Sequence, residues 1–183
     1  MADPPPPLAL TDSGPLWQVA GWEGFEAALG PVLDTAGIAG IGGYRKVAPG
    51  EEVALFRIAP DRVLLSGAGA PAIAAQAAGD GRLVALDLSD AFGVLRVDGP
   101  DAEALLSRLL PVDVALSAFP AGEFRQTAAH GIRVLIHRTD PCGFDLLVPR
   151  SWGESLRDFA VAVGQTLGET GSPAGIGSRP PTP

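Results

Sequence analysis

The side chains that most often carry chemistry are few in this sequence of 183 residues, which contains two histidines and one cysteine. His130 and His137 flank one predicted strand, and their odd separation points side chains to opposite faces of a strand. Catalytic zinc needs about three protein ligands held together, and a serine nucleophile paired with histidine needs a context such as Gly-x-Ser-x-Gly, which is absent. We therefore expect both histidines to be structural or exposed, and we predict neither a catalytic residue nor a metal site.

The one thiol, Cys142, lies in residues 140–143 (DPCG), a stretch that predicts a hairpin loop. A single cysteine excludes an internal disulfide framework and a thiolate zinc cluster. The loop itself contains no basic residue that would activate a thiol, although Arg138 is close in sequence. We interpret Cys142 as an ordinary loop residue.

Four glycines, Gly37, Gly40, Gly42 and Gly43, suggest comparison with nucleotide-binding loops. The dinucleotide fingerprint Gly-x-Gly-x-x-Gly would require a third glycine where Arg45 stands, and a helix after it, whereas a strand pattern follows. The phosphate-loop pattern with lysine and serine or threonine is also absent. We interpret the segment as a flexible link or turn.

Acidic residues gather modestly in the second half, at Asp87, Asp90, Asp98, Asp101, Glu103 and Asp113. Asp98 and Asp101 fall at the start of a predicted helix, where free backbone amides and the helix dipole favour anions. This structural role explains these two residues without catalysis.

The composition excludes several classes of protein. The net charge is −8 and the 13 basic residues are scattered, so the chain lacks the basic footprint needed to contact phosphates, and we expect no nucleic-acid partner. No apolar run approaches the ~20 residues that span a bilayer, and the start (MADPPPP) lacks the features of a secretory signal. We therefore expect a cytoplasmic protein without a membrane partner.

The distribution of proline and apolar residues predicts the domain organisation. Residues 1–15 are rich in proline and residues 168–183 contain almost nothing to bury, so both are predicted to be disordered tails. The 46% apolar residues are enough for a hydrophobic core over 16–167, which has the length of one domain or of two small subdomains, 16–80 and 81–167.

Hydrophobic periodicity predicts helices at 22–29, 71–78, 101–110 and 152–167. It predicts strands at 41–47, 52–58, 63–65, 82–88, 92–97, 124–129, 132–137 and 144–148. Ser151 and Glu154 form a capping-box pattern for the last helix, whose apolar stripe is predicted to pack on a sheet. The fold class is α+β, with mixed, mostly antiparallel strands and amphipathic helices, and the order of elements over 92–129 is compatible with a ferredoxin-like subdomain.

Several segments together resemble a known family. The gamma subunits of heterotetrameric sarcosine oxidase are similar to this chain at 54–65 (ALFRIAPDRVLL), 119–122 (FPAG), 126–127 (QT), 134–138 (VLIHR) and 144–151 (FDLLVPRS). The wider superfamily, which includes the glycine-cleavage aminomethyltransferase, is similar at 87–90 (DLSD), 94–102 (VLRVDGPDA), 105–106 (LL) and Asp113. The resemblance spans roughly residues 50–167 and implies two ferredoxin-like subdomains like those of the aminomethyltransferase folate-binding domain.

The aminomethyltransferase resemblance makes Asp113 the one candidate folate contact. In that family an Asn-Asp pair after the corresponding helix includes an aspartate that contacts folate, and this chain has Val112-Asp113, with the aspartate but not the asparagine. The alternative, which we favour, is that Asp113 forms a turn or a helix end. The Lys-Gly-Cys motif of a related iron–sulfur assembly branch is absent.

The sarcosine oxidase resemblance implies a non-catalytic gamma subunit of a complex that oxidatively demethylates sarcosine or a related N-methyl amine. Its partners would be the alpha, beta and delta subunits, which would hold FAD, FMN, NAD, tetrahydrofolate and zinc, while this chain binds no cofactor. The alternative is a stand-alone folate-binding protein of one-carbon transfer.

An assembly role directs attention to large apolar side chains that could contact partners. The candidates are Trp17, Trp22, Phe119 and Trp152, because aromatic residues are enriched in interface cores. For Trp22 and Trp152 we favour a place in the hydrophobic core.

Overall fold

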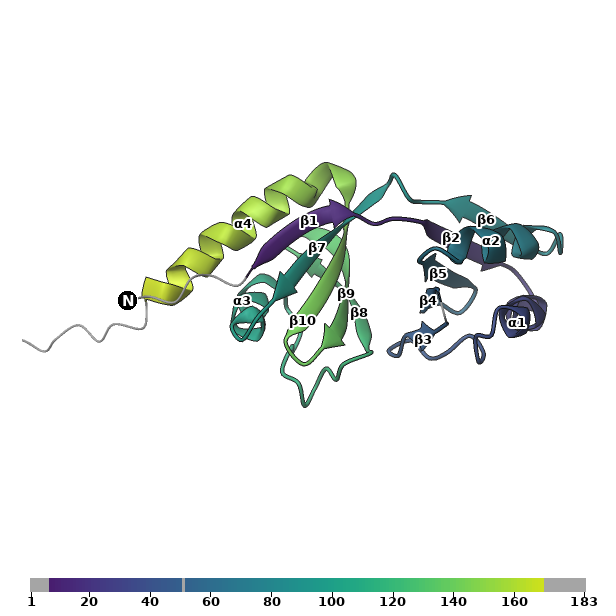
Figure 1. Cartoon of the computed structure of the whole chain (residues 1–183), viewed down its shortest axis with the longest axis horizontal. Coiled ribbons are helices and arrows are strands. Elements are labelled where there is room, and N and C mark those ends of the chain that lie inside the picture. The colour runs from purple at the N-terminus through teal and green to yellow at the C-terminus, as the bar shows by residue number, and fades with distance from the viewer. Residues whose placement is uncertain (1–6, 51, 170–183) are drawn as a thin grey trace, which may run out of the picture.

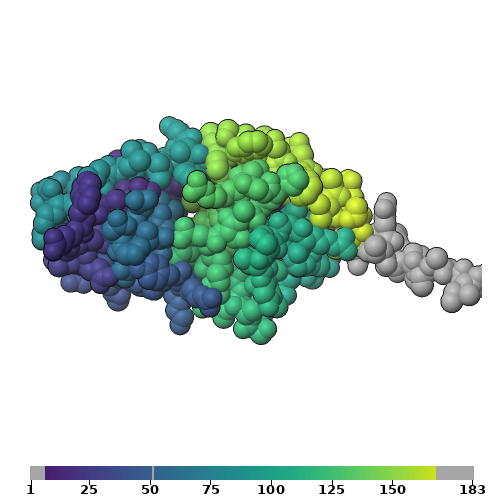
Figure 2. Space-filling model, turned by 180° about the vertical axis from the view of Figure 1, so that it is seen from behind, coloured from purple at the N-terminus to yellow at the C-terminus, as the bar shows by residue number. Residues whose placement is uncertain are grey.

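The chain folds into two lobes, each a five-stranded antiparallel sheet with two helices packed on one face (Figure 1). The computed structural model describes residues 7–50 and 52–169. Figure 2 shows from behind that the lobe in purple, blue and teal is in contact with the mostly green and yellow lobe. The predicted α+β class and the mostly antiparallel pairing are confirmed.

The first lobe has the strand order β3-β4-β5-β2-β6. Its elements are β2 (Leu16–Gly21), α1 (Phe25–Thr35), β3 (Ala48–Pro49), β4 (Ala54–Ala59), β5 (Arg62–Ser66), α2 (Ala70–Ala78) and β6 (Leu83–Asp87). Without the short β3, this is the βαββαβ connection and strand order of a ferredoxin-like fold. Apolar side chains on one face of the sheet, such as Val19, Leu55 and Val63, pack against α1 and α2.

The second lobe has the strand order β1-β7-β10-β9-β8. Its elements are β1 (Leu8–Asp12), β7 (Phe92–Asp98), α3 (Ala102–Leu109), β8 (Phe124–Ala129), β9 (Ile132–Asp140), β10 (Gly143–Pro149) and α4 (Arg150–Glu169). The predicted strand–helix–strand unit is present as β7, α3 and β8, and β8 is also the first strand of the predicted meander β8-β9-β10. However, β10 lies between β7 and β9, so the strand order differs from that of the first lobe.

β1 corrects the prediction of a disordered tail over residues 1–15. It pairs with β7 along its whole length, with Leu8 opposite Val97 and Leu10 opposite Leu95. Leu8 and Leu10 pack against the core of the second lobe, which offsets the entropy lost by ordering the strand. Of the tail predicted over 168–183, the first two residues belong to α4, and 170–183 lie outside the described residues.

The boundary between the subdomains also differs from the prediction of 16–80 and 81–167. β6 pairs with β2 in the first lobe, so the chain passes to the second lobe between Asp87 and Phe92. In return, β1 lies in the second lobe although it precedes the first. The chain therefore crosses between the lobes twice.

Helix α1 begins three residues later than predicted, at Phe25, because Gly24 has a left-handed backbone with φ of 79°. This places Trp22 in the turn before the helix. The predicted strand at 41–47 is a loop in which Lys46 forms a single bridge to Glu123 of the second lobe.

Helix α4 confirms the predicted apolar stripe but not the predicted cap. Leu156 and Ala160 are buried against the second sheet, as the stripe requires. The helix starts at Arg150, so Ser151 lies within its first turn, and the Glu154 carboxylate pairs with Arg157 at 2.7 Å.

Candidate functional site

The two histidines lie in different environments, and the structure does not bring them together. His130 forms a two-residue turn with Gly131 between β8 and β9, has φ of 48°, and is exposed with its ring 4.5 Å from that of Phe159. His137 lies on the face of β9 that meets the first lobe, where its ring is 5.4 Å from that of Phe56. The two imidazoles therefore have separate structural settings.

Cys142 is exposed in the loop between β9 and β10, as predicted. The glycine-rich link between α1 and β3 is a loop with left-handed backbone at Gly37, Gly40 and Gly42. No helix begins after it, so it lacks the amide-lined start of a nucleotide-binding loop.

Asp113, the candidate folate contact, is exposed after α3, and its Oδ1 accepts a hydrogen bond of 3.0 Å from the backbone amide of Ala115. This is the local turn that aspartate commonly forms. The geometry agrees with the turn role that we favoured from the sequence.

The loop that holds Asp113 is fixed by Arg138, whose side chain is fully buried. The Arg138 guanidinium donates to the backbone oxygens of Val114 and Pro141 and forms an ion pair of 2.5 Å with Glu103. It also stacks 4.4 Å above the ring of Phe144. Arg138 thus joins α3, β9 and two loops within the second lobe.

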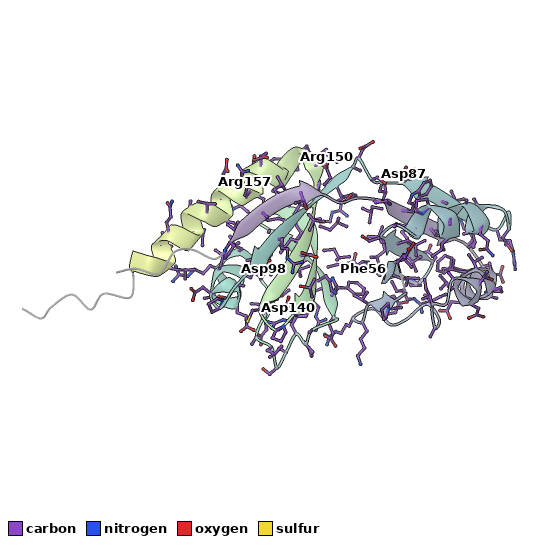
Figure 3. All side chains as sticks on the ribbon, in the orientation of Figure 1. Phe56, Asp87, Asp98, Asp140, Arg150 and Arg157 are labelled. Atoms are coloured by element: carbon purple, nitrogen blue, oxygen red, sulfur yellow. The ribbon has the colours of Figure 1, made fainter. Side chains whose placement is uncertain are left out.

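The seam between the lobes has an apolar centre and a row of polar residues. At the centre, Phe56 of β4 lies between the lobes (Figure 3). Its ring centroid is 5.4 Å from that of Phe124 of β8. In the second sheet, cross-strand pairing places Arg96, Asp145 and His137 side by side in one row that continues to Phe124. These side chains share one face because paired residues on adjacent strands point the same way.

Burial changes the titration of two members of this row. Desolvation lowers the pKa of His137, and the positive charge of Arg96 lowers it further. Desolvation also raises the pKa of Asp145, although the charge of Arg96 opposes this shift. At neutral pH the imidazole is therefore uncharged.

Two hollows open on the seam. One is a cavity of about 210 Å³ lined by both sheets, with Ser66, His137 and Asp145 as its polar members. The other is a largely apolar groove of about 590 Å³, whose polar lining residues are Gln18, Gln126, Thr127 and Arg133.

An exposed apolar edge continues from the groove. Leu86 of β6 is paired directly with Gln18, which lines the groove, so its side chain lies on the groove side of the first sheet. Val84 lies on the same side of the first sheet as Leu86. Val84 is 52% exposed and Leu86 is 53% exposed. β6 is the last strand of its sheet, and its residues 83–86 carry no charge. We call Val84, Leu86 and the groove beside them the β6 surface.

The predicted aromatic contacts are partly corrected. Trp22 and Trp152, for which we favoured the core, are 76% and 51% exposed. Phe119 is fully buried, where it packs against Phe144 and stacks with Arg125. Trp17 is half-buried against the core of the first lobe.

Within the part of the chain that the structure describes, no group of three or more metal-ligating side chains comes together. None of the helices in residues 7–50 and 52–169 has the length and apolarity to cross a bilayer.

Sequence reasoning missed Ser66, Asp145 and the β6 surface. Asp145 alternates with Phe144 and Leu146 as any exposed strand residue would, and only the pairing of β10 with β7 and β9 reveals its neighbours. A detectable signal was the uncharged run 83–86 (LVAL), which has no alternating polar face although one face of β6 is not covered by helices.

Two lobes of antiparallel sheet with helices on their outer faces define the chain as a two-subdomain α+β protein. Residues 52–180 match the family model of the GCVT N-terminal domain, and the chain belongs to this family. No curated protein matches the sequence significantly.

Solved structures have the same fold. A chain of the heterotetrameric sarcosine oxidase from Corynebacterium sp. U-96, solved in complex with pyrrole 2-carboxylate, is 23% identical with a TM-score of 0.75, over 88% of this chain and 85% of that chain. The glycine cleavage system aminomethyltransferase T from Bartonella henselae is 18% identical with a TM-score of 0.56, over 84% of this chain and 45% of that chain. This chain thus spans less than half of the aminomethyltransferase.

Proposed function

We propose that this chain is a non-catalytic, gamma-type subunit of a heterotetrameric complex of the sarcosine oxidase type. The observation that carries the proposal is the match to one chain of such a complex over 88% of this chain and 85% of the other, which makes the two chains nearly equal in length. The segments that resemble gamma subunits support the same assignment. In this proposal the complex is cytoplasmic and oxidises sarcosine or a related N-methyl amine.

The residues that the sequence shares with the family have folding roles, and this supports an assembly function. The Asp87 carboxylate accepts from both the amide and the hydroxyl of Ser89, and the Ser89 hydroxyl accepts from the amide of Leu16. The Arg150 guanidinium donates to the Asp90 carbonyl and pairs with Asp12 at 2.7 Å, where the chain crosses between lobes (Figure 3). Such residues maintain the fold and have no part in a reaction.

The β6 surface is the part of the molecule that we assign to partner contact. An edge strand with four uncharged residues in a row (83–86) and two half-exposed aliphatic side chains is a liability in a free monomer, because its backbone can pair with another chain. The adjoining groove extends the apolar area, as is typical of protein interfaces. In the proposed complex one of the alpha, beta and delta subunits covers this surface, and the FAD, FMN, NAD, tetrahydrofolate and zinc are held by those partners.

Co-expression with the alpha, beta and delta subunits tests the proposal, with the mass of the purified species measured by light scattering. We expect one large complex containing this chain, and we expect Leu86→Lys to release the chain from it while the free variant stays folded. Gln76→Lys is the matched control, since Gln76 is exposed on α2 in the same lobe. A chain that stays separate from all three partners contradicts the proposed function.

The second candidate is a folate-binding protein of one-carbon transfer, which is favoured by membership of the GCVT N-terminal domain family and the fold of the aminomethyltransferase. Calorimetric titration of the isolated chain with tetrahydrofolate separates the two functions. Binding that is abolished by Asp113→Ala would replace the subunit proposal, whereas the exposed turn at Asp113 leads us to expect no binding.

A further inference from the structure

The cavity of about 210 Å³ on the seam combines apolar walls with three polar side chains from both lobes. Ser66 lies on β5 of the first sheet, while His137 and Asp145 lie on β9 and β10 of the second. The rest of the lining is apolar and includes Phe56 and Leu135. A small molecule in this cavity would touch both lobes.

Each polar side chain retains hydrogen-bonding capacity toward the cavity. Ser66 and His137 line the cavity, and among the described residues neither the Ser66 hydroxyl nor a ring nitrogen of His137 has a hydrogen-bond partner. Asp145 uses Oδ1 to accept from Arg96 at 3.2 Å, and no described contact uses its Oδ2. Polar groups inside a protein normally find partners, so these three are available to a ligand or to water.

The charge on Asp145 is only partly compensated by Arg96. The Arg96 guanidinium lies closer to Asp98, at 2.6 Å, than to Asp145, at 3.2 Å, and it also approaches Asp140 at 3.8 Å. One cation is therefore shared by three carboxylates, and His137 is neutral because burial lowers its pKa. Burial raises the pKa of Asp145, and a further positive charge beside the carboxylate would favour its ionised form.

We propose that this cavity binds a small organic ammonium ion. The ammonium donates to Asp145 and to an acceptor on His137 or Ser66, and its alkyl groups lie against Phe56 and Leu135. A carboxylate gives a strong, charge-assisted hydrogen bond to an ammonium. A metal ion fits poorly, since one carboxylate and one imidazole are fewer ligands than structural or catalytic sites use. The site does not depend on the proposed subunit role.

A pair of probes of equal shape tests the proposal on the full-length chain. Isopropylammonium and propan-2-ol differ in the charged group, and their binding is followed by chemical-shift changes of backbone amides in β5, β9 and β10. We expect saturable shifts with the ammonium and none with the alcohol. We expect Asp145→Asn to weaken ammonium binding at least about tenfold, as for loss of a hydrogen bond to a charged group, and the exposed control Asp34→Asn to leave it unchanged.

A second variant fills the cavity without altering its charge. Ala54 lines the cavity, so Ala54→Leu should block the ammonium while Asp145 and its pair with Arg96 remain. The dispersion of the amide signals shows whether Asp145→Asn disturbs folding. If it does, Ala54→Leu tests the proposal in its place. Equal responses to the two probes, or ammonium binding that survives both variants, would overturn the site. Association with partner subunits is measured separately, so failure here leaves the proposed function standing.

Discussion

One arginine side chain of the second lobe, that of Arg138, is fully buried. Arg138 donates hydrogen bonds to two backbone oxygens, forms an ion pair with Glu103 and stacks on Phe144. Glu103 is 38% exposed, so the pair is hydrated on one side. Arg138 therefore stabilises the lobe by saturating buried carbonyls as well as by its charge.

Replacing Arg138 tests this role. We expect Arg138→Met to lower the free energy of unfolding by roughly 3 kcal/mol, the lower end for a broken buried pair, because Glu103 remains hydrated. Urea denaturation measures the change. Arg157→Met is the control, since Arg157 pairs with Glu154 and Asp158 on the exposed side of α4 and should have little effect. Equal losses in the two variants would contradict the role of Arg138.

His137 predicts a pH dependence of stability. Its pKa is lowered in the folded protein, first by burial and second by Arg96, from an ordinary value of 6.5. The unfolded chain therefore binds the proton more readily, and the free energy of unfolding falls as pH decreases from 6.5 toward the folded-state pKa.

The variant His137→Gln isolates this effect. We expect the free energy of unfolding of this variant to fall less than that of the wild type when the pH is lowered from above 6.5 to below it. Urea denaturation at each pH measures the change. The raised pKa of Asp145 acts in the opposite direction and is present in both proteins. Gln76→Asn exchanges one uncharged, exposed side chain on α2 for another and should preserve the wild-type slope. An unchanged slope in His137→Gln would refute the prediction.

At this scale the sequence predicted local roles in part and long-range neighbours poorly. The turn at Asp113 is present, whereas Ser151 lies inside α4 and Asp101 makes no side-chain cap hydrogen bond at the start of α3. The turn at Asp113 connects residues two positions apart, so residue type and spacing suffice to predict it. The burial of Arg138 and the row that contains Asp145 depend on which strands become neighbours. Pairing between distant strands is not encoded in the spacing of either residue.

At the scale of elements, β1 is the largest difference between prediction and structure. The prolines before it suggested a tail, and five residues are too short for a clear alternating pattern. The strand forms because β7 offers an unpaired edge and α4 offers an apolar surface. Long, periodic elements such as α4 were predictable because their own burial pattern identifies them.

Removal of residues 1–12 tests whether β1 is structural. We expect a loss of about 2 kcal/mol in unfolding free energy, on the order of 1 kcal/mol for each half-buried leucine. Amides of β7 should also exchange with deuterium faster, as measured by mass spectrometry. A chain that lacks only residues 1–6 retains β1 and should keep the slow exchange. Identical exchange in both truncated chains would show that β1 contributes nothing.

At the scale of the whole molecule, a small apolar cluster joins the lobes, together with hydrogen bonds such as that from the Gln126 amide to the Ile58 carbonyl. Phe56 and Leu64 of the first lobe meet Phe124 and Leu135 of the second, and all four are at most 8% exposed. The sequence predicted two subdomains but not this contact, because the alternation within one strand does not identify the sheet against which that strand packs.

Phe56→Ala should therefore loosen both lobes. We expect a loss of about 3 kcal/mol, the usual cost of removing a buried phenylalanine side chain, and faster amide exchange in β4 and in β9. Phe159→Ala is the control, since Phe159 is 36% exposed on α4 and should cost less. Faster exchange confined to the first lobe would show that the lobes are not coupled through Phe56.

The two crossings between the lobes constrain the order of events during synthesis on the ribosome. The contiguous stretch from β2 to β6 contains every strand of its sheet, so it can close as soon as it has emerged. β1 emerges before it, yet its partner β7 follows only after that sheet has been made. The earliest strand is therefore among the later ones to find its place, because contacts distant in sequence form slowly.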